Sequence, residues 1–335
     1  MALRLRLPTL VALSALLLPL APACSAPGSS SQAAGEPSTP QVATGAAASD
    51  SDRAQRSGDR PVSAIDVVAD LQVRGLQLTL LANEGFALHS AETTVVIDAF
   101  VTEPYSQYDA LTETAADALR AGTAPFDDVT LALVSHVHRD HMQPGPTRAF
   151  LAASPDTQLV SSPEVVAAIE ADGDVDGAQL HPLLPPPGKL LNVSRRGVSV
   201  DLLLLPHGNE RFASIQNLGH LIAIGGVRVL HVGDADIVPA TFAEYGLPDR
   251  GIDVALVPYW YFLDPVGRSV IAEHLAAPTL IACHLPAGER ADFGRAVASS
   301  FPELIIAGER MQRWHVEPGQ RAVALEPAPA ANDER

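Results

Sequence analysis

This chain has few cysteines and few basic residues, and each shortage excludes a class of protein. It has 2 cysteines, Cys24 and Cys283, in 335 residues. Because Cys24 lies in a segment that we expect to be disordered, we expect no structural disulfide between them. The 22 basic residues are outnumbered by 39 acidic ones, which gives a net charge of −17. A protein that binds long nucleic acid needs basic surface to neutralise phosphates, so we expect a small-molecule substrate and no nucleic-acid partner.

The first 23 residues have the pattern of an export signal. Arg4 and Arg6 precede an apolar stretch, residues 7–20, that is too short to span a bilayer comfortably. Ala21-Pro22-Ala23 is a small-x-small cleavage site, and Cys24 follows directly, which resembles the lipobox at which bacterial lipoproteins are acylated. We expect an exported protein that is either lipid-anchored in the cell envelope through Cys24, its only contact with the membrane, or periplasmic or secreted.

The rest of the chain is expected to hold one domain between two disordered segments. Residues 24–60 are mostly Ala, Ser, Gly, Pro and Gln, and cannot bury enough apolar surface to offset the entropy of ordering. Residues 326–335 have the same character. The domain therefore spans residues 61–325. The sequence indicates no oligomeric state.

Short apolar runs predict many strands with helices between them. The expected strands are 76–81, 86–89, 93–97, 129–134, 158–161, 189–194, 198–205, 220–224, 227–232, 253–257 and 279–283. The expected helices are 107–121, 146–153, 163–170, 266–276 and 287–299. Gly225-Gly226 predicts a tight hairpin. Two β-rich halves with interspersed helices predict an α/β (α+β) fold in which sheet packs on sheet and the helices lie outside.

The most informative segment is Ser135-His136-Val137-His138-Arg139-Asp140-His141, which directly follows the apolar run Val129–Val134. Imidazole nitrogens and carboxylate oxygens are the usual ligands of catalytic zinc. A buried strand that ends at such a cluster delivers it to the open edge of a sheet. The segment therefore predicts a metal site at that edge.

Three further polar residues, His207, Asp234 and His284, each follow an expected buried strand. Taken alone, a histidine at a strand end is more often a hydrogen-bonded surface group, and a Gly-Asp pair after a strand is usually a turn. Their common placement predicts instead that they converge with the histidine cluster. His220 competes with His207 as a ligand, but it lies inside an expected strand, which favours a core position. His231 is expected to be a packed histidine.

The segment His136-Val137-His138-Arg139-Asp140-His141 resembles the H-x-H-x-D-H signature of the metallo-β-lactamase superfamily. The order of the other candidates is also similar, from a strand that ends at Asp98, through the signature, to His207, Asp234 and His284. The resemblance covers roughly residues 75–310. It implies a four-layer αβ/βα sandwich of two mixed β-sheets with outer helices.

The resemblance also implies two zinc ions per chain, with Mn²⁺ or Fe²⁺ as alternative metals. The implied ligands are His136, His138 and His207 for one ion, Asp140, His141 and His284 for the other, and Asp234 as the bridge. Asp98 would form hydrogen bonds near the signature loop without binding metal. This set differs from that of the carbapenem-hydrolysing lactamases, whose bridging position is not an aspartate and whose second site usually includes cysteine. We therefore do not expect β-lactam hydrolysis.

The implied function is that of a metal-dependent hydrolase whose dinuclear zinc site and bridging hydroxide cleave an ester, lactone or phosphodiester bond of a small substrate. Zinc lowers the pKa of a bound water to about 7, so no serine or cysteine nucleophile is required. The chain indeed has no G-x-S-x-G elbow and no glycine-rich phosphate loop. Asp140 is the expected catalytic residue, which orients the hydroxide and relays its proton. The alternative is a non-catalytic metal-binding or scaffold protein on the same fold.

Aromatic residues make up 5% of the chain, yet several follow one another in Pro258-Tyr259-Trp260-Tyr261-Phe262. Because this run follows an expected strand at the same edge as the ligands, we expect Tyr259, Trp260 and Tyr261 to line the mouth of the site and contact the substrate. Plain packing of a loop over the core is the alternative. The fold does not select one substrate.

Overall fold

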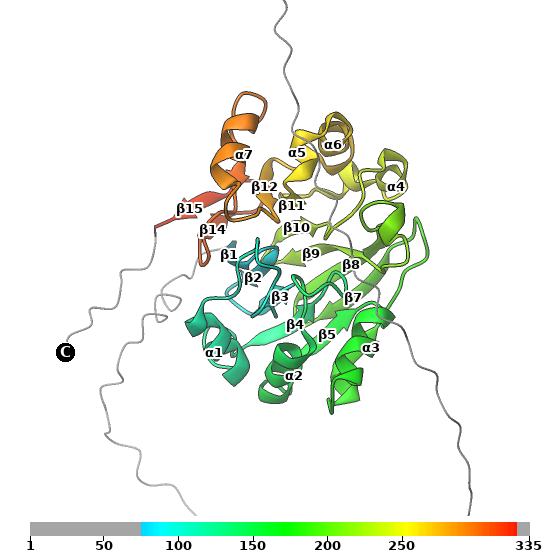
Figure 1. Ribbon diagram of the computed structural model, residues 1–335, viewed down its shortest axis with the longest axis vertical. Coiled ribbons are helices and arrows are strands. Elements are labelled where there is room, and N and C mark those ends of the chain that lie inside the picture. The colour runs from blue at the N-terminus through cyan, green and yellow to red at the C-terminus, as the bar shows by residue number, and fades with distance from the viewer. Residues whose placement is uncertain (1–74, 327–335) are drawn as a thin grey trace, which may run out of the picture. The chain divides into compact units, whose positions relative to one another are not determined.

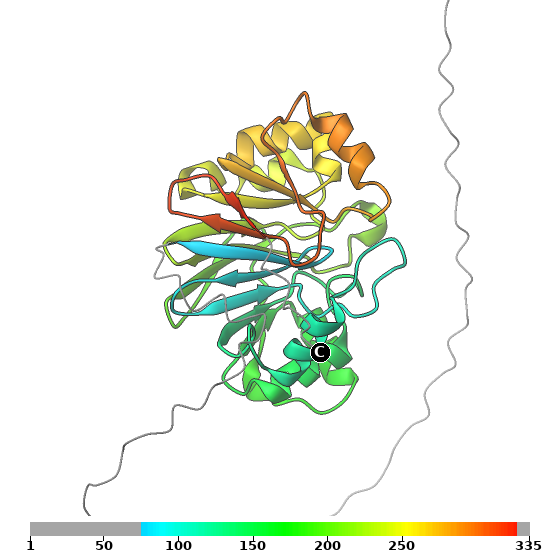
Figure 2. The same cartoon turned by 90° about the vertical axis from the view of Figure 1, so that its left-hand side faces the viewer.

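The computed structural model describes residues 75–326, which form two β-sheets packed face to face with helices on both outer faces (Figure 1). Figure 2 shows the same layers from the side, with the sheets between the two groups of helices. The four-layer arrangement implied by the resemblance is confirmed. The expected signal peptide and tether, and all but the first residue of the expected tail, lie outside the described residues. Within residues 75–326, every helix is too short or too polar to cross a bilayer.

The first sheet has the strand order β15-β14-β1-β2-β3-β4-β5-β6. Its strands are β1 (Leu76–Ala82), β2 (Gly85–His89), β3 (Thr94–Ile97), β4 (Val129–Leu133), β5 (Gln158–Ser161), β6 (Leu180–Pro182), β14 (Arg313–Val316) and β15 (Val323–Leu325). The strands from β3 to β6 are parallel, and those from β15 to β3 are antiparallel. Every residue of β4 is buried, as expected for a parallel strand covered on both faces. This strand leads directly into the histidine cluster.

The second sheet has the order β13-β12-β11-β10-β9-β8-β7. Its strands are β7 (Leu191–Arg195), β8 (Val198–Leu204), β9 (Leu218–Ile224), β10 (Val227–His231), β11 (Val254–Pro258), β12 (Thr279–Cys283) and β13 (Ile305–Ile306). The hairpin between β9 and β10 is confirmed, and its Gly225 and Gly226 have φ of +59° and +81°. A two-residue hairpin turn with positive φ at both positions favours glycine.

The helices lie in two groups that cover the outer faces of the sheets (Figure 1). On the first sheet lie α1 (Glu113–Ala121), α2 (Pro144–Ala153) and α3 (Pro163–Ala171), and on the second α4 (Pro239–Ala243), α5 (Trp260–Leu263), α6 (Pro265–Val270) and α7 (Arg290–Val297). The buried apolar residues form one cluster between the sheets and one beneath each group of helices. Each sheet is thus covered on both faces, and the ends of its strands are left for loops.

Several local expectations differ from the structure. Helix α1 begins at Glu113, not near residue 107, because the Thr112 hydroxyl accepts a hydrogen bond from the backbone N–H of Ala115 and caps the helix. The expected helix 266–276 is α6 followed by a π-helical turn, Ile271–Leu275. The aromatic run is not an open loop, because it ends β11 and continues into α5.

Candidate metal centre

The segment Ser135–His141 leaves the carboxyl end of β4 and is fastened by the buried carboxylate of Asp98. Asp98 Oδ1 accepts the backbone N–H of Ser135 at 2.7 Å, and Oδ2 accepts the Ser135 hydroxyl at 2.6 Å and His141 Nδ1–H at 2.8 Å. Burial alone would raise the pKa of Asp98, but its bonds and charge interaction with His141 hold the pKa below its usual value. Asp98 therefore stays ionised and orients His141 so that Nε2 faces the other ligands.

The other three candidate ligands lie at the carboxyl ends of strands in the second sheet. His207 follows β8, Asp234 follows β10, and His284 follows β12. Asn217 joins two of these segments, because its side-chain amide donates to Leu205 O, after β8, at 3.4 Å and to Val232 O, after β10, at 3.1 Å. Its carbonyl also accepts the backbone N–H of Asp234 at 3.2 Å. A further backbone bond from Gly208 N–H to Asp234 O, at 2.9 Å, ties the segment after β8 to the segment after β10. These bonds set the approach of the ligands to one another.

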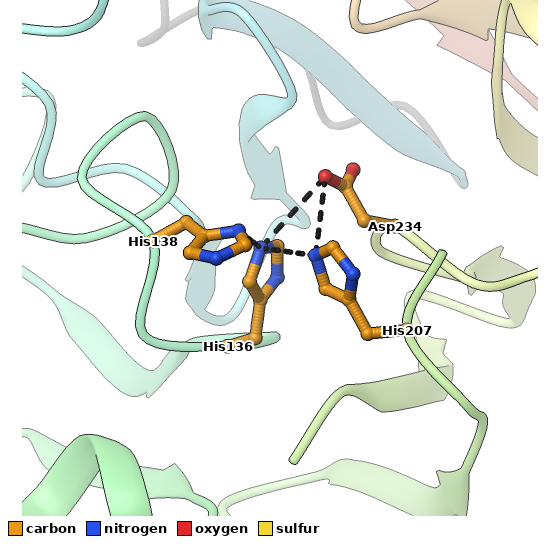
Figure 3. Close-up of side chains that lie close together, drawn as sticks. All are labelled: His136, His138, His207 and Asp234. Carbon is orange, nitrogen blue, oxygen red and sulfur yellow. Dashed lines mark hydrogen bonds and ion pairs between the residues drawn. The ribbon is translucent and has the colours of Figure 1, made fainter. Parts of the chain in front are cut away.

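The first group of ligand atoms comprises His136, His138, His207 and Asp234, whose side chains converge on one point (Figure 3). His136 Nε2 lies 3.0 Å from His138 Nδ1 and 3.2 Å from His207 Nε2. Asp234 Oδ2 lies 3.5 Å from His207 Nε2 and 3.8 Å from His136 Nε2. The potential ligand atoms of all four residues lie within 4.8 Å of one another.

The second group comprises Asp140, His141 and His284. His284 Nε2 lies 3.2 Å from His141 Nε2 and 3.4 Å from Asp140 Oδ2. Asp234 also reaches this group, because its Oδ1 lies 3.3 Å from His284 Nε2 and 3.5 Å from His141 Nε2. One oxygen of Asp234 therefore faces each group. This is the placement that a bridging ligand requires.

The hydrogen-bond chemistry of the two groups fits metal ions. A neutral imidazole has one N–H and one lone pair. His136 Nδ1–H donates to Ser135 Oγ at 3.0 Å, and His141 Nδ1–H donates to Asp98, so in the neutral form that binds metal both Nε2 atoms present lone pairs to the groups. The buried Oδ1 of Asp234 has no hydrogen-bond partner within residues 75–326. Lone pairs that meet at one point repel each other unless a cation lies between them, so these residues fit two metal ions.

The protonation states of the buried side chains also fit metal ions. Burial lowers the pKa of His136 well below its usual value, and the neighbouring His141 lowers it further, which keeps His136 in the neutral form that binds metal. Burial would raise the pKa of Asp234, but His284 and His141 hold it well below its usual value. Burial would lower the pKa of His141, but Asp234 and Asp98 raise it. The site therefore holds ionised carboxylates that attract positive charge.

A buried carboxylate that the sequence did not single out lies beneath the site. Glu84 lies in the turn between β1 and β2, yet it is 1% exposed, and burial raises the pKa of its carboxyl. Its Oε1 accepts the Cys283 thiol at 3.2 Å, and its Oε2 lies 3.7 Å from His141 Nδ1. His231 Nε2–H donates to the backbone carbonyl of Glu84 at 3.1 Å. A turn motif carries no signal of such burial, because the neighbours come from β10 and β12.

The histidines that we expected to be core residues are buried. His220 lies inside β9 with no exposed surface, and it belongs to none of the ligand groups found within residues 75–326. His231 is also fully buried. Of this pair, only His207 lies at the end of its strand beside His136, so the structure favours His207 over His220 as a ligand.

The three aromatic residues expected to contact substrate lie in different places. The ring of Trp260 lies edge-on to His284, 5.1 Å between centroids, and Tyr259 packs against Phe293. Tyr261 is 0% exposed and its hydroxyl donates to Ala235 O at 2.9 Å. The expectation for Tyr261 is therefore corrected: its ring is part of the core beneath α5, because the helical turn of α5 points it inward.

Two aromatic residues near the ligands were missed from the sequence. Tyr108 lies in the loop before α1, with its ring 4.6 Å from that of His284. Phe212 lies 5.2 Å from the ring of His207 and 5.7 Å from that of His138. Both are half-buried. Neither stands in a motif, so only the folded chain brings them to the site.

Comparison with known proteins agrees with this architecture. A family described as a β-lactamase superfamily domain matches residues 77–284. The fold is similar to that of the metallo-β-lactamase fold protein YhfI from Bacillus subtilis, with 15% identity, a TM-score of 0.51, and coverage of 73% of this chain and 100% of that one. None of the curated proteins matches the sequence.

Two further solved structures share the fold. One, described as a possible metal-dependent hydrolase from Veillonella parvula, has 15% identity, a TM-score of 0.52, and coverage of 71% of this chain and 98% of that one. The other is an isothiocyanate hydrolase from Delia radicum gut bacteria, with 15% identity, a TM-score of 0.52, and coverage of 70% and 97%. At this level of identity the likeness establishes the fold.

Proposed function

This chain belongs to the β-lactamase superfamily, and from that membership we propose that it is a metallo-hydrolase with a dinuclear zinc centre that cleaves an ester, lactone or phosphodiester bond of a small substrate. The observation that carries the proposal is the pair of ligand groups that share Asp234. His136, His138 and His207 would hold one ion, Asp140, His141 and His284 the other, and Asp234 both. When bound, the two ions would lower the pKa of a water to about 7 and polarise the oxygen of the scissile bond.

Asp140 is the residue that we assign to proton transfer. Burial would raise the pKa of Asp140, but its interactions with His284 and His141 hold the pKa below its usual value, so the carboxylate is ionised at neutral pH. Its backbone carbonyl accepts the side-chain amide of Asn83 at 3.2 Å, which helps to hold the residue in place. We propose that the Asp140 carboxylate orients the attacking water, accepts its proton and returns it to the leaving group.

The proposal is tested by metal analysis of the purified full chain together with a panel of lactone, nitrophenyl ester, bis-nitrophenyl phosphate, thioester and β-lactam substrates. We expect about two divalent ions per chain, as in other two-metal sites, and turnover of an ester, lactone or phosphodiester. Asp140→Asn should reduce turnover by about 10²- to 10⁴-fold, the range of general acid–base catalysis. Asp156→Asn is the matched control, because the Asp156 side chain is 83% exposed and belongs to no ligand group within residues 75–326.

The outcomes separate the alternatives. Bound metal without turnover of any substrate would favour a non-catalytic metal-binding or scaffold protein. Turnover that survives Asp140→Asn unchanged would refute the role of Asp140. Elemental analysis of protein supplied with zinc, manganese or iron identifies the metal, because imidazole suits several transition metals and does not select zinc alone.

We also propose that the protein is exported and works in the cell envelope or outside the cell, anchored through an acylated Cys24. The support is the charged, apolar and small-residue pattern of residues 1–23 and the position of Cys24 directly after it. The net charge of −17 supports a small-molecule substrate over nucleic acid.

A further inference from the structure

Aromatic rings lie against both groups of metal ligands. Phe212 contacts His207 and His138, with ring centroids 5.2 and 5.7 Å apart. Tyr108 and Trp260 both contact His284, with centroids 4.6 and 5.1 Å apart. Asp234 directs one oxygen to each ligand group, so Phe212 lies on one side of the Asp234 carboxylate and Tyr108 and Trp260 lie on the other. We name these three residues the aromatic walls.

Phe212 is held in place by the turn that follows His207. Gly208 has φ of +51°, and a Cβ there would lie 3.2 Å from Phe212 Cδ2, so glycine lets the chain fold the ring back against the ligand. The backbone N–H of Phe212 donates to Asn209 O at 2.8 Å, and the Asn209 side chain accepts the N–H of Arg211 at 3.1 Å. The guanidinium of Arg211 lies 5.4 Å from the centre of the Phe212 ring. This wall is therefore preorganised.

The opposite wall is tied to the second sheet. Trp260 begins α5 directly after β11, so its position is set by the sheet. Tyr108 lies in the loop before α1. The backbone carbonyl of Gln107 in this loop accepts a hydrogen bond from the backbone N–H of Ala287 at 3.0 Å. The ion pair between Asp109 and Arg290 joins the same loop to α7. Both rings are half-buried and lie beside His284, and Trp260 also packs against the core cluster beneath the helices of the second sheet.

We propose that the aromatic walls bind an apolar, flat group in the acyl part of the substrate, and that the substrate is an ester or lactone of an aromatic or similarly apolar carboxylic acid. This inference rests on the proposed hydrolase function and narrows it. Aromatic faces stack on flat apolar groups, but they do not replace the hydrogen bonds that a phosphodiester makes with water. Arg211, over the Phe212 ring, and Arg139, over the Tyr105 ring, are exposed, and Arg139 is bonded to the backbone carbonyl of Glu103. Their attraction for a phosphate would be weakened by salt.

The test compares nitrophenyl acetate, butyrate and benzoate, which share one leaving group and differ only in the acyl part. For the wild type we expect kcat/KM to be highest for the benzoate. Phe212→Ala should lower kcat/KM for the benzoate by about 10- to 100-fold, in the range of pocket contacts of this size, and lower kcat/KM for the acetate by a much smaller factor. Phe212→Leu should restore part of the loss, and metal content should stay at the wild-type value in both variants.

Tyr105→Ala is the matched control, because Tyr105 is an aromatic residue of the same loop as Tyr108, is 44% exposed and lies beneath Arg139 instead of a ligand. It should leave the preference for the benzoate unchanged. A second wall variant, Trp260→Ala, should lower the benzoate rate selectively. Equal losses for acetate and benzoate in the wall variants, or a wild type that prefers the acetate or the phosphodiester, would overturn the inference.

A binding measurement separates this inference from the proposed function. Calorimetry of the metal-loaded wild type should show tighter binding of benzoate than of acetate, and Phe212→Ala should remove the difference. If no ester, lactone or phosphodiester of the panel is hydrolysed but this difference is found, the proposed function fails and the aromatic walls stand. If the esters are hydrolysed but the two carboxylates bind equally, the walls fail and the proposed function stands.

Discussion

Replacing Asp98 by asparagine should loosen metal binding without a direct change to any ligand. Asp98 is fully buried and accepts three hydrogen bonds, from Ser135 N–H, the Ser135 hydroxyl and His141 Nδ1–H. A charge-assisted bond contributes roughly 1 kcal/mol more than a neutral one, so Asp98→Asn should cost about 3 kcal/mol of stability. The asparagine N–H₂ would also face groups that donate, which leaves a buried donor without a partner.

The larger effect of Asp98→Asn should be on metal affinity. Asp98 holds the His141 ring so that Nε2 faces the second group of ligands, and loss of such a partner typically costs about 10- to 100-fold in metal affinity or activity. Competition with a chelator of known affinity measures this change, and denaturant unfolding of the metal-free protein measures the stability separately.

Asp253→Asn is the control for this experiment. Asp253 is also buried, at 9% exposure, and accepts two backbone N–H groups, from Arg228 at 2.7 Å and Gly319 at 2.8 Å. It directly precedes β11, whereas the ligands follow the carboxyl ends of β8, β10 and β12. Its replacement should lower stability and leave metal affinity unchanged. Equal metal affinities for Asp98→Asn and the wild type would refute the orienting role of Asp98.

Three further predictions test the fold and the export signal. Burial lowers the pKa of His89 from 6.5 to about 4, so only the unfolded state binds a proton at this residue as the pH falls from 6.5 to 4. The free energy of unfolding should therefore fall by about 3 kcal/mol over that pH window. Denaturant unfolding of the wild type and of His89→Gln at each pH should show a smaller fall for the variant. Gly233→Ala should destabilise the protein by about 3 kcal/mol and reduce its metal content, because φ of Gly233 is +56° and a Cβ would meet the Asn217 side chain. Gly246 has the same φ but open space around it, so Gly246→Ala should cost only about 1 kcal/mol, measured by thermal unfolding. Cys24→Ala should release the protein from the membrane fraction of the producing cell, and retention there would contradict acylation at Cys24.

Most secondary-structure elements could be predicted because each is encoded by a local pattern. The strand 158–161 and the strand 279–283 have the predicted bounds, and helix α3 begins at the predicted residue, Pro163, with Ser162 as its cap. The bounds that were wrong depend on contacts or caps that a hydrophobic pattern does not show. Thr112, for example, starts α1 six residues later than the apolar spacing suggested, because its hydroxyl caps the helix.

Residues near the site also differ in whether they could be predicted from the sequence. Seven candidate ligands could be picked from the sequence, because each follows an apolar strand and the order of the set resembles that of a known family. Their distances could not be predicted, because they depend on bonds such as those of Asn217 that join separate loops. Glu84 could not be distinguished from an ordinary turn residue, since its burial depends on β10 and β12.

The sequence by itself determined the kind of site, because the ligand types and their positions after buried strands are written along the chain. Only the tertiary structure decided what surrounds that site. It turned Tyr261 into the core and left Trp260 beside His284 through one helical turn, and it brought Tyr108 and Phe212 to the ligands from two separate loops. The physical reason is that a ligand set is specified by residue chemistry at strand ends, whereas the walls of a site are made by contacts between loops whose paths depend on the whole packed fold.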